Sequence, residues 1–318
     1  MLDINFIREN PDKMKKACRD KNVDVDIDRV LALDKGKRQL QTEIEMLKAE
    51  QNKISRGGKD NTAIFVQAKE IKGKIKEMEP ELEKIDAELK NFLLILPNVP
   101  FDDVPVGKDD SQNQVLRKVG STPKFIFNKP KDYIELGEAL DLIDTDRAGK
   151  VAGSRFGYIK RQLPILEFAL VKLVMDTVQK EKFIPVIPPV MLKDQMARGT
   201  GYFEAADEKE AYHLPDDDMY LVGTSEQSLV SMYADEILDE KDLPIRYVGF
   251  STCFRREAGS YRKEERGMIR GHQFNKVEMF QYTKPGESWA GFDNMRSQAE
   301  KLLAGLGLHF QTSKLAAG

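Results

Sequence analysis

Charged side chains fall in a strand-like rhythm between residues 250 and 282, FSTCFRREAGSYRKEERGMIRGHQFNKVEMFQY. Side chains two residues apart lie on the same face of a strand, which groups Cys253, Arg255 and Glu257 in the first half. In the second half the same rhythm groups His272, Phe274, Lys276, Glu278, Phe280 and Tyr282. Because burying an isolated charge is costly, such a face is either exposed to solvent or part of a polar ligand site.

The loop between the two predicted strands is rich in cations, namely Arg262, Lys263, Arg266 and Arg270. Guanidinium and ammonium groups in such density suit an anionic ligand, for example a nucleotide phosphate. The pattern alone fits a surface hairpin with a solvated, charged face equally well.

The two ends of this segment resemble motif 2 of class II aminoacyl-tRNA synthetases, in the form found in seryl-tRNA synthetases. FRREAGS at 254–260 and RGHQFNKVE at 270–278 occur in the order and at a spacing similar to that family. The resemblance implies that Arg255 holds the ATP α-phosphate and the amino-acid carboxylate, that Glu257 meets the adenine amino group, and that adenine stacks on Phe274. The ATP site that it implies comprises Arg255, Arg256, Glu257, Phe274 and, near the outer phosphates, Arg270.

A second segment, MYLVGTSE at 219–226, predicts a strand that runs into a helix beginning near Gln227. Thr224 and Glu226 are two residues apart and share a face at the strand end, and Ser225 is placed to help cap the helix. Capping alone would explain the hydroxyl side chains. The resemblance implies instead a site for L-serine formed by Thr224, Ser225, Glu226 and Glu278, with Arg255 and Glu278 as the catalytic residues.

Residues 27–95 carry apolar side chains at alternating spacings of three and four, which is the heptad pattern of a coiled coil. SRGGKDN at 55–61 is a turn signal between two such runs. We therefore predict an antiparallel helical hairpin, each helix roughly 40 Å long at 1.5 Å per residue. Pro80 should kink the second helix or mark a local break.

Charge is distributed unevenly along this predicted arm. Residues 35–76 hold eleven Lys and Arg against five Asp and Glu, whereas residues 77–92 hold six acids against two bases. Helix pairing and solubility explain such charges in any coiled coil, and phosphate contacts explain them in an RNA-binding one. Seryl-tRNA synthetases carry a coiled-coil arm that holds the long variable arm of their tRNA, so the resemblance favours RNA. We predict tRNA contacts from Lys48, Lys53, Arg56, Lys59 and Lys72.

The chain divides into a predicted tRNA-binding domain at 1–100, a linker at 101–113 and a partial class II catalytic domain at 114–318. The linker falls within residues 95–113, which hold three prolines and an acidic cluster. The apolar helix expected at 162–183 and the following IPVIPPVML resemble motif 1, which builds the homodimer interface of that family. A core helix packed on an edge strand is the alternative. The expected fold class is α+β, with an antiparallel two-helix coiled-coil arm followed by an incomplete antiparallel β-sheet domain flanked by helices.

Composition limits the remaining possibilities. The 318 residues suffice for about two domains, and the net charge of -3 provides no global basic field, so RNA contacts must arise locally. Cys18 and Cys253 are the only cysteines, which argues against a disulfide scaffold and favours a reducing cytosol. His213, His272 and His309 show no metal-ligand spacing. The start lacks an apolar signal core and no run is long enough to span a membrane, so we predict a cytoplasmic protein with no membrane contact.

The resemblance covers residues 1 to about 315 and stops before motif 3, the glycine-rich segment whose arginine binds the ATP γ-phosphate in class II synthetases. The acidic metal ligands of the family are likewise expected beyond Gly318. We therefore expect a fragment or a natural truncation that on its own is inactive or very weak in adenylation. ATP is the expected substrate, and Mg²⁺ is expected to assist positioning and charge stabilisation without a covalent nucleophile.

The leading hypothesis is a serine–tRNA ligase, which forms seryl-adenylate from L-serine and ATP and transfers serine to tRNA-Ser and, by family analogy, to tRNA-Sec. One alternative is a non-catalytic tRNA-binding paralogue derived from a synthetase, but the intact set of site residues argues against it. Another is a ligase that loads a carrier protein. Relatives of that kind lack the long arm that this sequence predicts.

Overall fold

The computed structural model describes residues 2–56, 62–126, 130–201, 210–257 and 268–318. They form two compact units, one of residues 1–116 and 312–318 and one of residues 117–311. Each unit contains its own clusters of buried apolar side chains.

Two short helices open the first unit, α1 (Ile4–Glu9) and α2 (Pro11–Asp20). The Asp3 side chain caps α1 by accepting the N–H of Asn5 at 2.8 Å. Pro11 stands at the first turn of α2, where its missing N–H would have had no helical partner. Both local choices start a helix at a defined residue.

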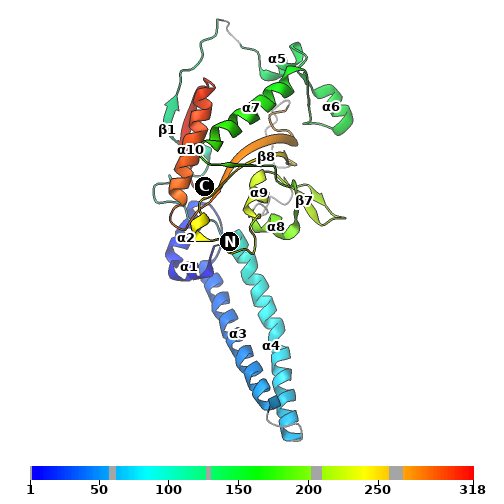
Figure 1. The fold of residues 1–318 in the computed structure, drawn as a ribbon. Helices are drawn as coiled ribbons and strands as arrows, with labels where there is room; N and C mark the ends of the chain where they lie inside the picture. The colour runs from blue at the N-terminus through cyan, green and yellow to red at the C-terminus, as the bar shows by residue number, and fades with distance from the viewer. Residues whose placement is uncertain (1, 57–61, 127–129, 202–209, 258–267) are drawn as a thin grey trace. The chain divides into compact units, whose positions relative to one another are not determined.

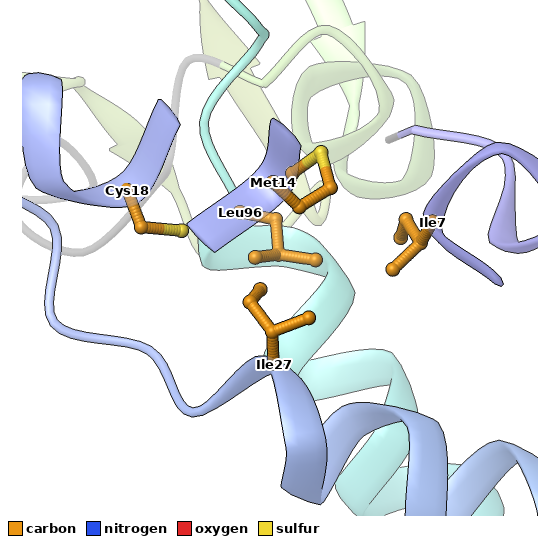
Figure 2. Packing of buried hydrophobic residues seen from close by; sticks show 5 residues of the cluster. All are labelled: Ile7, Met14, Cys18, Ile27 and Leu96. Carbon is orange, nitrogen blue, oxygen red and sulfur yellow. The ribbon is translucent and has the colours of Figure 1, made fainter. Parts of the chain in front are cut away.

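These helices close over the base of the arm through a buried apolar cluster. Figure 2 shows its members, Ile7, Met14, Cys18, Ile27 and Leu96. Three come from the two short helices, Ile27 is the first residue of α3, and Leu96 directly follows α4. Full burial of one such side chain contributes about 1.5–3 kcal/mol. The cluster therefore fixes the base of the arm on the N-terminal helices.

The arm consists of α3 (Ile27–Arg56) and α4 (Thr62–Ile95), which lie side by side (Figure 1). The predicted heptad seam is confirmed, because these members of it are buried between the helices: Val30, Leu33, Ile44, Ile71, Ile75 and Leu89. The predicted turn at 55–61 begins later than expected, since α3 continues through Arg56. Residues 57–61 lie outside the described residues.

Pro80 lies inside α4, which continues to Ile95. The proline is exposed, so its ring faces solvent, and the helix lacks the hydrogen bond of that residue on its solvent side. Of the two outcomes that the sequence left open, a break in the helix is therefore excluded. The packing of Leu82, Ile85 and Leu89 beyond the proline continues the seam.

Ion pairs also join the two helices, in each case from a base on α3 to an acid on α4. Arg29 bonds to Glu88 at 2.8 Å and Lys48 bonds to Glu79 at 2.9 Å, while Lys37 pairs with Asp86. Part of the charge asymmetry predicted for RNA binding thus serves helix pairing. Because all these groups are exposed or half-exposed, each pair contributes at most about 1 kcal/mol.

The central sheet of the second unit contains β4 (Ile184–Val186), β8 (Ile245–Phe254) and β9 (Gln273–Tyr282), in that order. β8 and β9 form a ten-residue antiparallel ladder from Ile245 opposite Tyr282 to Phe254 opposite Gln273. β4 runs parallel to β8, in contrast to the all-antiparallel sheet that the sequence suggested. The α+β fold class is confirmed.

Helices cover both faces of this sheet. α7 (Gln162–Gln179) and α10 (Ser288–Gly305) contact each other and share an apolar cluster with one sheet face, built on Val178, Phe183 and Val248 (Figure 1). α9 (Ser225–Val230) packs against the other face, where Gly249 permits the approach. A Cβ at Gly249 would lie 3.0 Å from the Leu229 side chain.

α7 ends four residues before the predicted limit at 183. Lys182 has a left-handed backbone with φ of 65°, which turns the chain out of the helix and into β4.

The remaining elements are short. The second unit also contains α5 (Tyr133–Ala139), β2 (Ile143–Asp144), α6 (Thr145–Ala152), β3 (Tyr158–Ile159), β5 (Met191–Lys193), α8 (Asp194–Gly199), β6 (His213–Leu214), β7 (Met219–Leu221) and η3 (Glu240–Asp242). Before them come η1 (Asp110–Gln112) and β1 (Gln114–Val119), and β1 pairs with β10 (Phe310–Lys314). Within the described part of the chain, no helix combines the length and apolar character needed to cross a membrane.

Candidate active site

Polar side chains gather on the face of β8 and β9 that α9 covers. Register places Gly249 opposite Glu278 and Cys253 opposite Phe274, so the even-numbered side chains of β9 face α9. Phe274, Lys276 and Glu278 follow one another along this face. The strand rhythm in the sequence predicted this grouping.

Glu278 is the centre of a hydrogen-bonded cluster. Its Oε2 accepts the hydroxyl of Thr224, the hydroxyl of Ser225 at 3.2 Å and the N–H of Glu226 at 3.2 Å. Its Oε1 accepts from the Lys276 ammonium at 2.9 Å. The predicted serine-site residues are therefore brought together, Thr224, Ser225 and Glu278 by their side chains and Glu226 by its backbone.

The start of α9 explains why a Thr–Ser–Glu sequence stands here. Thr224 is the N-cap, with extended backbone and a side-chain oxygen that accepts the N–H of Glu226 at 3.2 Å. The helix begins at Ser225, two residues before the predicted start, and the cap is Thr224 where Ser225 was expected. Thr224 and Ser225 are both fully buried, which directs their hydroxyls toward the sheet.

The electrostatic environment of Glu278 keeps it ionised. Burial alone would raise the pKa of its carboxyl, but hydrogen bonds from Thr224, Lys276 and Ser225 together lower that pKa below its usual value. A half-buried carboxylate that stays charged can bind a cation, and the ammonium group of an amino acid is a cation of suitable size.

Lys276 is a site residue that the sequence prediction did not assign. Its ammonium donates to Thr224 Oγ1 at 2.8 Å as well as to Glu278, and so fixes both groups. The signal was present, because Lys276 shares the period-2 face with Phe274 and Glu278. The sequence alone does not show the partner of this lysine, because Thr224 comes next to it only when α9 packs against β9.

Arg255 and Phe274 form the next group along this face. The Arg255 guanidinium lies over the Phe274 ring, 5.3 Å from its centre, and its Nε donates to the Gly223 carbonyl at 3.2 Å. A half-buried guanidinium beside an aromatic ring suits a phosphate next to a purine base.

β8 ends at Phe254, so Arg255, Arg256 and Glu257 follow the strand. Arg255 still lies beside Phe274 on the predicted face, whereas Glu257 does not continue that face. Glu257 has a left-handed backbone with φ of 49°, which breaks the alternation. Its carboxylate pairs with Arg270 at 3.1 Å. The Arg256 guanidinium lies 5.8 Å from the centre of the Tyr212 ring. Arg262, Lys263 and Arg266 lie outside the described residues.

The predicted tRNA contacts lie on the arm. Lys53 on α3 and Lys72 on α4 are exposed, whereas Lys48 is engaged with Glu79. Arg56 is the last residue of α3, and its side chain and Lys59 lie outside the described residues.

A metal site is not formed by the part of the chain that is described. No group of three or more His, Cys, Asp or Glu side chains in it could hold a metal ion.

Comparison with known proteins decides the family. Residues 1–100 match the family described as the seryl-tRNA synthetase N-terminal domain, and residues 210–317 match the tRNA synthetase class II core domain of the G, H, P, S and T type. The whole chain is 41% identical to Serine–tRNA ligase 2 of Clostridium acetobutylicum, of which it covers 77%. The chain belongs to the seryl-tRNA synthetase family.

Further members of this family agree in sequence and structure. The whole chain is 40% identical to the serine–tRNA ligase of Symbiobacterium thermophilum and covers 77% of it. The seryl-tRNA synthetase of Pyrococcus horikoshii, solved in complex with ATP, superposes with a TM-score of 0.89 at 35% identity, over 100% of this chain and 77% of that one. The enzyme of Naegleria fowleri, solved with AMP, gives a TM-score of 0.85 at 28% identity, over 100% of this chain and 76% of that one.

Proposed function

We propose that this protein is a serine–tRNA ligase, which activates L-serine with ATP and transfers the serine to tRNA-Ser. The observation that carries the proposal is the shared face of β9, which presents the half-buried Glu278 carboxylate and the Arg255–Phe274 pair. Phe274 and Glu278 are four residues apart, about 13 Å along a strand. An elongated ligand with an ammonium group at one end and a purine at the other fits this layout.

In the first step, the serine carboxylate attacks the α-phosphorus of ATP and forms an acyl–phosphate bond. The bond from the α-phosphorus to the oxygen that bridges it to the β-phosphorus breaks, and pyrophosphate leaves with that oxygen. Glu278 would hold the serine ammonium, and the hydroxyls of Thr224 and Ser225 keep the Glu278 carboxylate oriented. Arg255 would neutralise the charge that builds on the α-phosphate. Phe274 would stack on adenine, Glu257 would accept its amino group, and Arg256 and Arg270 would lie near the phosphates.

The second step passes serine to tRNA. We assign residues 1–100, with the arm, to tRNA binding, residues 101–113 to the linker and residues 114–318 to the catalytic domain. The exposed Lys53 and Lys72 support a phosphate contact along the arm more than Lys48 does, because Lys48 already pairs with Glu79. By family analogy, tRNA-Sec is a second substrate of the same arm.

We also propose a homodimer built on α7. This helix exposes apolar side chains to an unusual degree, with Ile165 at 69% and Phe168 at 65% of their full exposure. An apolar cavity of about 680 Å³ adjoins it, lined in part by Val151, Tyr158 and Leu166. Contiguous apolar surface of this kind is typical of subunit interfaces.

The place of action that we propose is the cytoplasm. Cys18 and Cys253 are both buried as free thiols, and buried thiols of this kind persist in a reducing compartment.

Serine-dependent exchange of pyrophosphate into ATP tests the central proposal. We expect the purified full-length protein, meaning this chain together with any residues that follow Gly318 in its gene, to support exchange with serine and far less with alanine or glycine. The reason is that a site that bonds a hydroxyl rejects analogues lacking it. The 318-residue chain by itself is expected to be inactive or very weak. Glu278→Gln and Arg255→Ala should each abolish most of the exchange. Binding of tRNA-Ser without any exchange would instead identify a non-catalytic tRNA-binding paralogue.

A further inference from the structure

Arg155 lies between α6 and β3 and contacts both chain segments that flank residues 258–267. Its Nη1 donates to the carbonyl of Glu257 at 3.0 Å, and its own carbonyl accepts the N–H of His272 at 3.2 Å. Glu257 follows β8, and His272 directly precedes β9. One residue from a distant part of the sequence thus bonds to Glu257 after β8 and to His272 before β9.

The two residues after Arg155 pack against the same place. The Phe156 ring lies 5.3 Å from the imidazole of His272. Gly157 approaches Met268 so closely that a Cβ there would lie 2.1 Å from the Met268 sulfur. Residues 155–157 therefore follow the chain just before β9 in close contact, and a larger residue at position 157 would require the Met268 side chain to move.

Tyr133, at the start of α5, adds a separate contact. Its hydroxyl oxygen accepts the N–H of Met268 at 2.8 Å and the N–H of Ile269 at 3.2 Å. The backbone before β9 is thus held at two points by residues from the α5–β3 region.

The conformation of Glu257 depends on this arrangement. Both Arg155 and Glu257 have left-handed backbones, with φ of 61° and 49°, which side-chain-bearing residues adopt only where surrounding contacts hold them. The guanidinium of Arg155 fixes the Glu257 carbonyl and so sets the direction of the Glu257 side chain, which pairs with Arg270.

We propose that Arg155 is a positioning residue for ATP recognition, which holds Glu257 and Arg270 where they meet the nucleotide. This inference rests on the proposed function, in which Glu257 accepts the adenine amino group. Arg155 acts through the backbone of Glu257 and not on the serine site, because the cluster around Glu278 contains no atom of Arg155 among its hydrogen-bond partners in the described residues.

The test compares Arg155→Ala, Arg155→Lys and the control Arg147→Ala in the full-length protein. Arg147 is an exposed arginine on α6 that pairs with Asp144. Serine-dependent exchange is measured with ATP and with purine riboside triphosphate, which lacks the adenine amino group. We expect R155A to raise the KM for ATP about tenfold, as for a lost charge-assisted hydrogen bond, with the KM for serine unchanged.

R155A should also narrow the preference for ATP over the analogue, and R155K should restore part of it because an ammonium group can donate to one carbonyl. Hydrogen exchange at the amides of His272 and Arg255 in the ligand-free variants reports whether the backbone around Arg155 loosens without nucleotide, since the His272 N–H bonds to the Arg155 carbonyl and the Arg255 N–H to the His272 carbonyl. Faster exchange with unchanged nucleotide preference would reduce Arg155 to a structural residue and overturn the proposal, as would an R155A enzyme equal to the R147A control. If wild type itself supports no exchange, the proposed function fails, and this inference fails with it.

Discussion

At the scale of single residues, the hydroxyl of Thr224 has no bonding capacity left in this structure. A threonine hydroxyl offers one donor and two acceptor positions. Thr224 donates to Glu278 and accepts from Lys276 and from the N–H of Glu226. We infer that Thr224 serves the substrate by holding Glu278, whose charge then becomes the feature that binds an amino acid.

Replacing Lys276 with methionine should expose this dependence on charge. The variant keeps the apolar stem but removes a hydrogen bond and a positive charge that lower the pKa of Glu278, while the burial that raises that pKa remains. Because a depressed pKa keeps Glu278 ionised until the pH falls through it, K276M should lose serine activation at higher pH than wild type. We expect kcat/KM for serine to fall about tenfold at neutral pH.

The measurement is the pH profile of kcat/KM for serine from acid to neutral pH. Lys284→Met is a matched control. Lys284 lies just beyond the end of β9, and its partner is the exposed Glu240 and not Glu278. An acid limb of K276M that coincides with that of wild type would show that Lys276 does not govern the ionisation of Glu278.

At the scale of elements, two local rhythms located the arm and one strand of the central sheet. The heptad seam located α3 and α4, and the alternation at 272–282 located the polar face of β9, because both patterns depend only on neighbours along the chain. The pairing of β4 with β8 and the contacts of Arg155 with Glu257 and His272 join distant segments. No local period records such contacts, so these features appear only in the structure.

Three tyrosines join α9 and the segment after it to the sheet, and they make the unit sensitive to alkali. The Tyr282 hydroxyl donates to the Leu229 carbonyl on α9, and the hydroxyl oxygens of Tyr233 and Tyr247 lie 2.5 Å apart. Burial raises the pKa of Tyr247 and that of Tyr282 to about 12 each. A raised folded pKa gives stability that is present below the unfolded value of about 10 and lost as pH rises toward 12.

Tyr247→Phe should therefore weaken the loss of stability between about pH 10 and 12, by about 2 kcal/mol. Urea unfolding at several alkaline pH values measures it, with Tyr158→Phe as the control because Tyr158 is 45% exposed. Parallel decline of Y247F and wild type would contradict the assignment.

At the scale of the whole molecule, the exposed face of α7 predicts self-association. Phe168→Asp places a charge in a face that also exposes Ile165 and Leu166, and burying that charge in an interface is costly. We expect the full-length variant to sediment as a monomer at concentrations where wild type is a dimer. The control is Lys301→Asp, since Lys301 is a charged and exposed residue of α10 and does not belong to the α7 face. A dimer that survives F168D would place the interface elsewhere.

The arm supports a separate prediction at this scale. Because the net charge is -3, any attraction for RNA must come from local groups of Lys and Arg side chains. Lys53 and Lys72 are exposed on α3 and α4, so replacing both with glutamine should weaken tRNA-Ser binding without loosening the apolar seam. If both contact phosphates, the slope of log affinity against log salt should fall by about 1 to 2, since each phosphate contact contributes about 0.7–0.9. Filter binding across a salt series measures this slope, with Lys13→Gln on α2 as the control. An unchanged slope with weaker binding would mean that the lysines act through the shape of the arm, and unchanged binding would leave helix pairing and solubility as the roles of the charged arm.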